Sequence, residues 1–390
     1  MHVKRFILPL IIVLFIFSCR KDPAPDKPAE KPEEAVLTVT DGASCKFANA
    51  SGRNDVSLGF PRSGDRQKTS GTVKVAVIFV DFSDAVATVP PQQVFGLMSP
   101  ESENFLSTVS HTKLNIVFEP QFKWYRMSRP SNMYGWENLT FDLHKSYIQE
   151  AVNLADAEYD FSKVDEIVIM ANPQAGALNR SSSLIGMSGN AIVADGKTIT
   201  NAITPMSDIF VFTGLLFPHE FGHSMGVPDL YSFRGPLHGY VGDFSIMGNV
   251  LGTAPTYNAW EQWLFGWFTD NQITCVRGKG TGSVQLTPVE QQDGMKLLVL
   301  PISTTAAVIV EDRRRIGYDN RIIKEGPLVY LIDNRIQTGA GVLKVLPLNT
   351  DDQVKTDAPL SVGQAVTYNG VTVKCTVSAS GGSTIEYERK

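Results

Sequence analysis

Two histidines and a glutamate at helical spacing are the residues of this sequence with the clearest potential for chemistry. His219, Glu220 and His223 form an H-E-x-x-H pattern. Residues four apart lie on one face of a helix, so both imidazoles can bind a single zinc ion. Glu220 lies beside that ion, where it can take a proton from a zinc-bound water. The pattern predicts zinc-dependent hydrolysis with Glu220 as the general base.

A third protein ligand has three candidates. Gly226 is expected to end the helix, because glycine tolerates the left-handed backbone of a helix stop, and the returning chain brings Asp229 toward the histidines. His238 is an alternative because nitrogen suits zinc, and Glu261 is another by analogy with zinc peptidases that use a distant glutamate. Asp229 needs the shortest excursion and is the predicted ligand. Three protein ligands and a water describe a catalytic zinc ion.

Two tyrosines follow the motif and are candidates for a role in the reaction. Either Tyr231 or Tyr240 can donate a hydrogen bond to the oxyanion that forms during peptide hydrolysis. A tyrosine that only packs is the alternative interpretation of each.

The remaining sequence predicts a large globular chain that places this motif beside a sheet. Of the 390 residues, 43% are hydrophobic and 19% are charged, and the net charge of −5 does not indicate a nucleic-acid partner. Apolar runs predict strands at 73–80, 114–118, 122–125 and 164–170. Helical spacing predicts helical stretches at 91–109 and a helix at 139–157. The alternation of strand and helix indicates an α/β layer. His144 is interpreted as a surface residue of the helix.

A hairpin is predicted just before the motif. Residues 191–194 and 198–203 are strand-like, with Asp195 and Gly196 at the turn, whereas 171–189 is expected to be a loop. An exposed strand beside the metal of a zinc peptidase commonly pairs with an extended substrate, so this hairpin is a candidate wall of the cleft. An ordinary sheet is the alternative.

Two acidic residues end the first predicted strand. Asp81 and Asp84 are expected to form a hydrogen-bonded turn, and a calcium site is the alternative.

The N-terminus has the features of a targeting segment. Lys4 and Arg5 precede an apolar run at 6–17 and then Cys19. This pattern is typical of a secretory signal. It also resembles a bacterial lipobox, which implies cleavage before Cys19 and lipid on its sulfur; an ordinary signal is the alternative.

The signal and the residues after it predict an exported lipoprotein. Residues 20–36 are rich in proline and charge and predict a solvated tether, and 37–72 is expected to be irregular with a short strand or two. The expected location is the outer membrane or the cell surface, with the periplasmic face as a further option.

The last third predicts a separate class of structure. Short strands and turns alternate from 271 to 390, which is typical of an all-β, sandwich-like domain following a catalytic domain at 73–270. Cys275 and Cys375 flank this part and are candidates to pair in an oxidising compartment. The alternative is that Cys45, Cys275 and Cys375 are all free.

Longer stretches of sequence resemble a known family. Three motifs in order are similar to the immune inhibitor A family of secreted bacterial zinc metallopeptidases: H-E-F-G-H-S-M-G-V-P-D-L-Y, G-D-F-S-I-M-G and W-E-Q-W-L-F-G-W. The similarity extends over about 73–333 and departs at 104–106 and 110–112, where the family usually has tyrosines and glycine. The resemblance implies an α+β, metzincin-like zinc-peptidase domain.

The resemblance also implies roles for particular residues. It assigns zinc to His219, His223 and Asp229, the general base to Glu220, and a turn beneath the metal to Met247. The leading hypothesis is a membrane-tethered zinc endopeptidase with a protein or peptide substrate. The alternative is a catalytically silent binding lipoprotein on the same scaffold, which the intact motif disfavours.

Overall fold

The computed structural model of the chain describes residues 36–347 and 353–390, which contain several sheets and few helices. The predicted signal peptide at 1–19, the lipidation of Cys19 and most of the predicted tether at 20–36 lie outside the described residues. No helix within the described ranges has the length and apolar character needed to cross a bilayer.

The sequence before the H-E-x-x-H motif forms a five-stranded mixed sheet with strand order β3-β2-β4-β8-β5. β2 (Gly71–Asp81), β3 (Leu114–Arg126), β4 (Glu166–Ala171) and β8 (Asn201–Thr204) run parallel to one another. β5 (Ser182–Ile185) pairs antiparallel with β8 and forms an edge of the sheet. At this edge, one side of β5 has no strand partner within residues 36–347 and 353–390.

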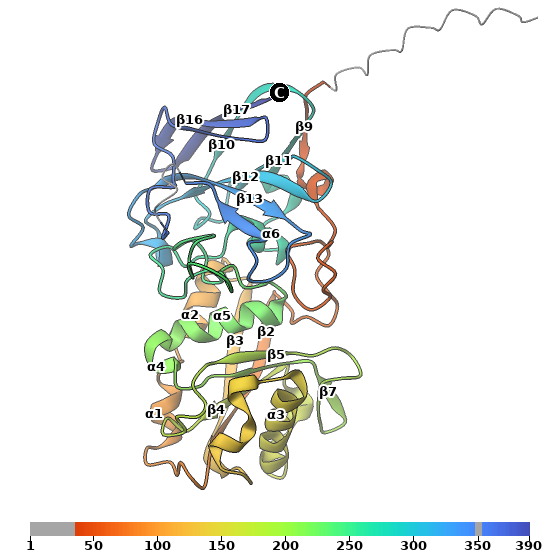
Figure 1. Cartoon of the computed structure of the whole chain (residues 1–390), viewed down its shortest axis with the longest axis vertical. Helices are drawn as coiled ribbons and strands as arrows, with labels where there is room; N and C mark the ends of the chain where they lie inside the picture. The colour runs from red at the N-terminus through yellow and green to blue at the C-terminus, as the bar shows by residue number, and fades with distance from the viewer. Residues whose placement is uncertain (1–35, 348–352) are drawn as a thin grey trace, which may run out of the picture. The chain divides into compact units, whose positions relative to one another are not determined.

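Helices cover both faces of this sheet because the side chains of β2 alternate between two apolar cores. Val75 and Val77 belong to the core that contains residues of α2 (Glu101–Val109) and α5 (Leu216–Met225). Ala76 and Ile78 belong to the core on the other face, which α3 (Phe141–Ala155) covers. α5, which carries the motif, therefore lies on the face opposite α3 (Figure 1).

Four predicted elements are confirmed. β2 and β4 correspond to the strands predicted at 73–80 and 164–170, and α3 corresponds to the helix predicted at 139–157. The helical stretch predicted at 91–109 is α1 (Pro91–Phe95) followed by α2. The two strands predicted at 114–118 and 122–125 are one strand, β3, whose pairing with β2 shifts register between Ile78 and Phe79. The chain therefore continues through Pro120 with an irregularity rather than a break.

The prediction of His144 as a surface residue is wrong. Its side chain is buried against the sheet, and its Nε2 lies 2.9 Å from Thr204 Oγ1. Burial lowers the pKa of His144 to about 3, so the imidazole is neutral at physiological pH.

Asp81 and Asp84 both bond within the protein. Asp81 pairs with Arg126 at 2.6 Å and accepts from the backbone N–H of Ala87, and Asp84 accepts the N–H and the hydroxyl of Ser131. These contacts favour the predicted turn over the calcium alternative.

Two further sheets form the C-terminal part, as the alternating pattern predicts. The first has the order β1-β9-β11-β12-β13-β14 and the second the order β10-β17-β16-β15. Their bounds are β1 (Thr38–Asp41), β9 (Ile273–Arg277), β10 (Gly280–Leu286), β11 (Leu297–Pro301), β12 (Ala306–Arg313), β13 (Gly326–Asp333), β14 (Leu343–Val345), β15 (Ala365–Tyr368), β16 (Val371–Ala379) and β17 (Gly382–Arg389). Side chains from both sheets, including Leu300 and Val373, share one apolar core.

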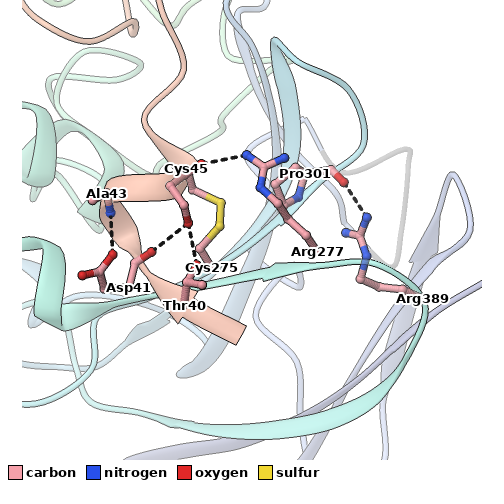
Figure 2. Close-up of a disulfide and its surroundings, with 9 residues drawn as sticks. Thr40, Asp41, Ala43, Cys45, Cys275, Arg277, Pro301 and Arg389 are labelled. Atoms are coloured by element: carbon pink, nitrogen blue, oxygen red, sulfur yellow. Dashed lines mark hydrogen bonds between the residues drawn. A yellow bond between two sulfur atoms is a disulfide. The ribbon is translucent and has the colours of Figure 1, made fainter. Parts of the chain in front are cut away.

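β1, near the start of the described chain, belongs to the first of these two sheets. β1 pairs antiparallel with β9, and a disulfide joins Cys45 to Cys275 with 5.8 Å between their Cα atoms (Figure 2). Among the described cysteines, Cys375 is a buried free thiol. The predicted pairing of Cys275 with Cys375 is therefore wrong, because the chain before β2 folds back across 230 residues of sequence to reach β9.

Candidate metal centre

α5 begins and ends where its sequence allows. Pro218 lies in the first turn, where its missing N–H leaves no helical bond unmade. Gly226 ends the helix as predicted, with a left-handed φ of 103°, and its N–H bonds back into the last turn. The left-handed φ favours glycine at this position, and a Cβ there would also crowd Arg66 Cγ at 3.0 Å.

The C-terminal end of α5 is stabilised by the segment before β2. The carbonyls of Ser224, Met225 and Gly226 accept hydrogen bonds from the Gln67 N–H, the Arg62 guanidinium and the Ser57 N–H, respectively, over 2.7–2.9 Å. The last carbonyls of a helix have no partner within the helix, so these contacts satisfy groups that would otherwise be orphaned.

The turn at Gly226 brings Asp229 against both histidines. Asp229 Oδ1 lies 3.4 Å from His219 Nε2 and 3.2 Å from His223 Nε2. Ligand atoms bound tetrahedrally to zinc at about 2.0–2.1 Å are about 3.3 Å apart, which matches these separations. Within the described part of the chain, this is the one group of three or more such side chains found close enough to hold a metal.

The state of Asp229 Oδ1 also fits a cation. This oxygen is buried and accepts no hydrogen bond from a described residue, whereas Oδ2 lies 3.5 Å from Thr338 Oγ1. Burial opposes ionisation, but the imidazoles of His223 and His219 hold the pKa of Asp229 well below its usual range. A buried anionic oxygen without a donor is the state expected of a metal ligand.

Backbone carbonyls orient the two imidazoles. His219 Nδ1 lies 2.9 Å from the Ile246 carbonyl, and His223 Nδ1 lies 2.9 Å from the Val227 carbonyl. A carbonyl only accepts, so each Nδ1 donates, and Nε2 is the nitrogen that can bind a metal once it has lost its own proton.

Met247 lies against the middle of α5. A Cβ built on Gly222, between Glu220 and His223, would lie 2.5 Å from Met247 Sδ. A larger residue at position 222 would therefore displace the Met247 side chain from the helix.

His238 and Glu261, the alternative third ligands, lie elsewhere in the described structure. His238 Nδ1 lies 3.0 Å from the Gly248 carbonyl. Glu261 is fully buried and accepts from Ser245 Oγ and the Asn258 N–H. Neither residue belongs to the group formed with Asp229.

The two tyrosines have different surroundings. The Tyr231 ring lies 6.2 Å from the His219 ring, at the cavity that contains the motif. Burial, Asp229 and Glu220 raise the pKa of Tyr231, so its hydroxyl keeps its proton and can donate it in a hydrogen bond. Tyr240 lies under the Lys344 ammonium, 5.2 Å from it, and does not line that cavity in the described structure.

A cleft of about 350 Å³ opens over the motif, and β5 forms one wall of it. Ser183 Oγ donates to Glu220 Oε2 at 2.6 Å and also lies 2.9 Å from the Glu220 carbonyl. The edge strand therefore orients the side chain predicted to be the base. Ser183 was not among the predicted site residues, because β5 falls within residues predicted to be a loop.

The predicted hairpin exists but does not form the cleft wall. β6 (Ile192–Ala194) pairs with β7 (Lys197–Ile199), and Asp195 and Gly196 have positive φ in the turn, as predicted. Among the described residues, the cleft is lined by other segments. β5 lies at the sheet edge because it pairs with β8, the strand that follows the hairpin.

The segment before β2 also lines the cleft. Arg53, Asp55 and Val56 line it, and Arg53 Nε donates to Asp55 Oδ1 at 2.8 Å. A second cavity of about 530 Å³ shares Asp55 and Val56 with the cleft. No local pattern in the sequence indicated this role.

No model of a known protein family matches this sequence, and no curated protein matches it with significant similarity.

Proposed function

We propose that this chain is a zinc-dependent endopeptidase with a metzincin-like catalytic site, exported as a lipoprotein. The observation that carries the proposal is the convergence of His219, His223 and Asp229, with the buried Asp229 Oδ1 lacking a hydrogen-bond donor among the described residues. Glu220 lies in the same cleft, where it completes the set of groups that a zinc hydrolase needs.

The donor set supports zinc in particular. Two imidazole nitrogens and one carboxylate oxygen leave a fourth position open, which is the arrangement of catalytic zinc sites. The same donors also suit Fe(II), but a general base beside the site favours hydrolysis. When bound, zinc would polarise the substrate carbonyl and make water a stronger acid.

The side chains of this chain would carry the proton. Ser183 occupies Oε2 of Glu220, so Oε1 is the atom that takes the proton from the attacking water. Glu220 would then deliver that proton to the leaving amine. Tyr231, at the same cleft, would donate a hydrogen bond to the developing oxyanion.

The edge strand supports a polypeptide substrate. Among the described residues, β5 has a strand partner on one side only, and it lines the cleft along its whole length. An extended peptide can add to such an edge through main-chain hydrogen bonds, which requires no particular sequence. Recognition of backbone over several residues suits an endopeptidase.

Two further features support the cellular setting. The N-terminal signal pattern with Cys19 is typical of a lipoprotein, and the Cys45–Cys275 disulfide suits an oxidising compartment outside the cytoplasm. The resemblance to the immune inhibitor A family points the same way.

Metal analysis combined with casein cleavage tests the proposal. The purified wild-type protein should contain zinc, cleave casein, lose activity with a chelator and regain it with added zinc. Glu220→Gln, prepared in parallel, controls for contaminating proteases. A protein that binds zinc but cleaves no peptide would instead favour the silent binding lipoprotein.

A further inference from the structure

Glu261 links the helix after the motif to the turn that contains Met247. Its Oε2 accepts a 2.8 Å hydrogen bond from Ser245 Oγ and another of 2.8 Å from the Asn258 N–H at the start of α6 (Ala259–Leu264). Ser245 Oγ in turn accepts the Met247 N–H at 3.2 Å. Ser245 and Glu261 are both fully buried, so water does not compete for these bonds.

We propose that the Ser245–Glu261 pair is a positioning element for the metal centre. It holds the 245–247 turn in the one conformation in which the Ile246 carbonyl meets His219 Nδ1, 2.9 Å away. This inference rests on the proposed function, because the value of orienting His219 lies in binding a metal.

The backbone of Ser245 provides independent support. Its φ of 77° lies in the left-handed region, which is unfavourable for a residue with a Cβ. Such a conformation persists only where its surroundings impose it. Here the Ser245 N–H bonds to the Ala254 carbonyl at 3.1 Å, and the hydroxyl bonds to Glu261. These bonds fix the left-handed residue in place.

The left-handed residue sets the direction of the next two residues. With Ser245 fixed, the Ile246 carbonyl is directed at His219 and the Met247 sulfur packs at Gly222. The Ile246 N–H bonds to the Pro255 carbonyl at 2.8 Å, so the backbone of Ile246 is held at its N–H as well as at its carbonyl. Loss of the Glu261 contact would therefore release the carbonyl that orients one ligand without touching any ligand.

Glutamine should replace Glu261 with little loss. One oxygen, Oε2, makes both bonds, while Oε1 has no partner among the described residues. The amide oxygen of Glu261→Gln can take the place of Oε2, and its nitrogen then replaces an oxygen that has no donor to lose. Glu261→Ala removes both bonds.

The test measures zinc affinity by competition with a chelator, together with the absorption spectrum of the cobalt-substituted protein and the melting temperature. Glu261→Ala and Ser245→Ala should weaken zinc affinity about 10–100-fold, the usual cost of losing a group that orients a ligand, and alter the cobalt spectrum. Glu261→Gln should retain wild-type affinity. Glu290→Gln is the matched control, because Glu290 also has a buried oxygen that bonds to no described residue, while its other oxygen accepts from the Arg314 N–H.

A purely structural role would lower the melting temperature of Glu261→Ala and leave its zinc affinity and cobalt spectrum unchanged, and that result would overturn the inference. Equal losses in Glu261→Gln and Glu261→Ala would also overturn it. If Glu261→Ala does not fold, Ser245→Ala decides the question. A wild-type protein with no affinity for zinc would instead refute the proposed function, and this inference with it.

Discussion

Replacing Ser183 by alanine isolates the contribution of the edge strand to the chemistry. The change removes the 2.6 Å hydrogen bond that Ser183 Oγ donates to Glu220 Oε2 and leaves the metal ligands and the substrate-facing backbone of β5 unchanged. Because Glu220 would be free to turn away from the attacking water, we expect kcat to fall while KM stays near the wild-type value.

The size of the effect follows from the kind of bond. A hydrogen bond to a charged group contributes about 1.5–3 kcal/mol. At 1.36 kcal/mol per tenfold in rate, its loss would lower kcat by roughly 10–150-fold. Ser183 is only partly buried, so water can replace part of the lost contact, and the lower end of this range, about tenfold, is the expected value.

Steady-state cleavage of a fluorogenic peptide measures kcat and KM separately. Ser182→Ala is the matched control: Ser182 is a neighbour on the same strand with similar exposure, and its hydroxyl bonds to no described residue. It should retain wild-type kcat. Equal kcat values for Ser183→Ala, Ser182→Ala and wild type would refute the role assigned to the Ser183–Glu220 contact.

The other predictions concern the base, the third ligand, the disulfide and the anchor. Glu220→Gln should keep its zinc and lose about 10²–10⁴-fold in kcat, measured beside metal content. Asp229→Ala should bind zinc much more weakly in a chelator competition, because a ligand is lost. Cys45→Ser should lower the free energy of unfolding by about 2–5 kcal/mol in denaturant titration, whereas Cys375→Ser keeps the disulfide and serves as its control. Cys19→Ser should move the protein from the membrane to the soluble fraction, or leave its signal uncleaved.

Each of these has a contrary outcome. Near-normal turnover by Glu220→Gln would exclude it as the base, and full zinc affinity in Asp229→Ala would exclude Asp229 as a ligand. Equal stability of Cys45→Ser and wild type would show that the disulfide does not constrain the unfolded chain. Unchanged detergent partition of a Cys19→Ser protein whose signal has been cleaved would refute lipidation.

Local patterns predicted the parts of the site that lie within one helix and one turn. His219, Glu220, His223 and Gly226 follow from helical spacing and glycine geometry, and Asp229 is only six residues past His223. The same holds for β2, whose continuous apolar run reflects burial on both faces of a sheet.

Contacts between distant segments could not be predicted in this way. Ser183 reaches Glu220 only because β5 pairs with β8, and its four residues have no strand-like hydrophobic pattern of their own. Cys45 pairs with Cys275 because β1 joins the C-terminal sheet. Spacing alone gives no preference among such distant partners.

His144 is a different case, because the signal was present. It lies three, four and seven residues before Tyr147, Ile148 and Ala151, which form the buried face of α3. The polarity of histidine argued for the surface, whereas the helical period placed it inside, where a neutral imidazole bonds to Thr204.

X-ray absorption at the zinc edge of the purified wild-type protein tests the central claim most directly. We predict one zinc ion per chain with three light protein ligands, of which two are imidazoles and one is the Asp229 carboxylate, at about 2.0–2.2 Å. Asp229→Ala should remove the carboxylate contribution and leave both imidazoles. A spectrum with three imidazoles, or a protein that takes up no zinc at all, would contradict the account.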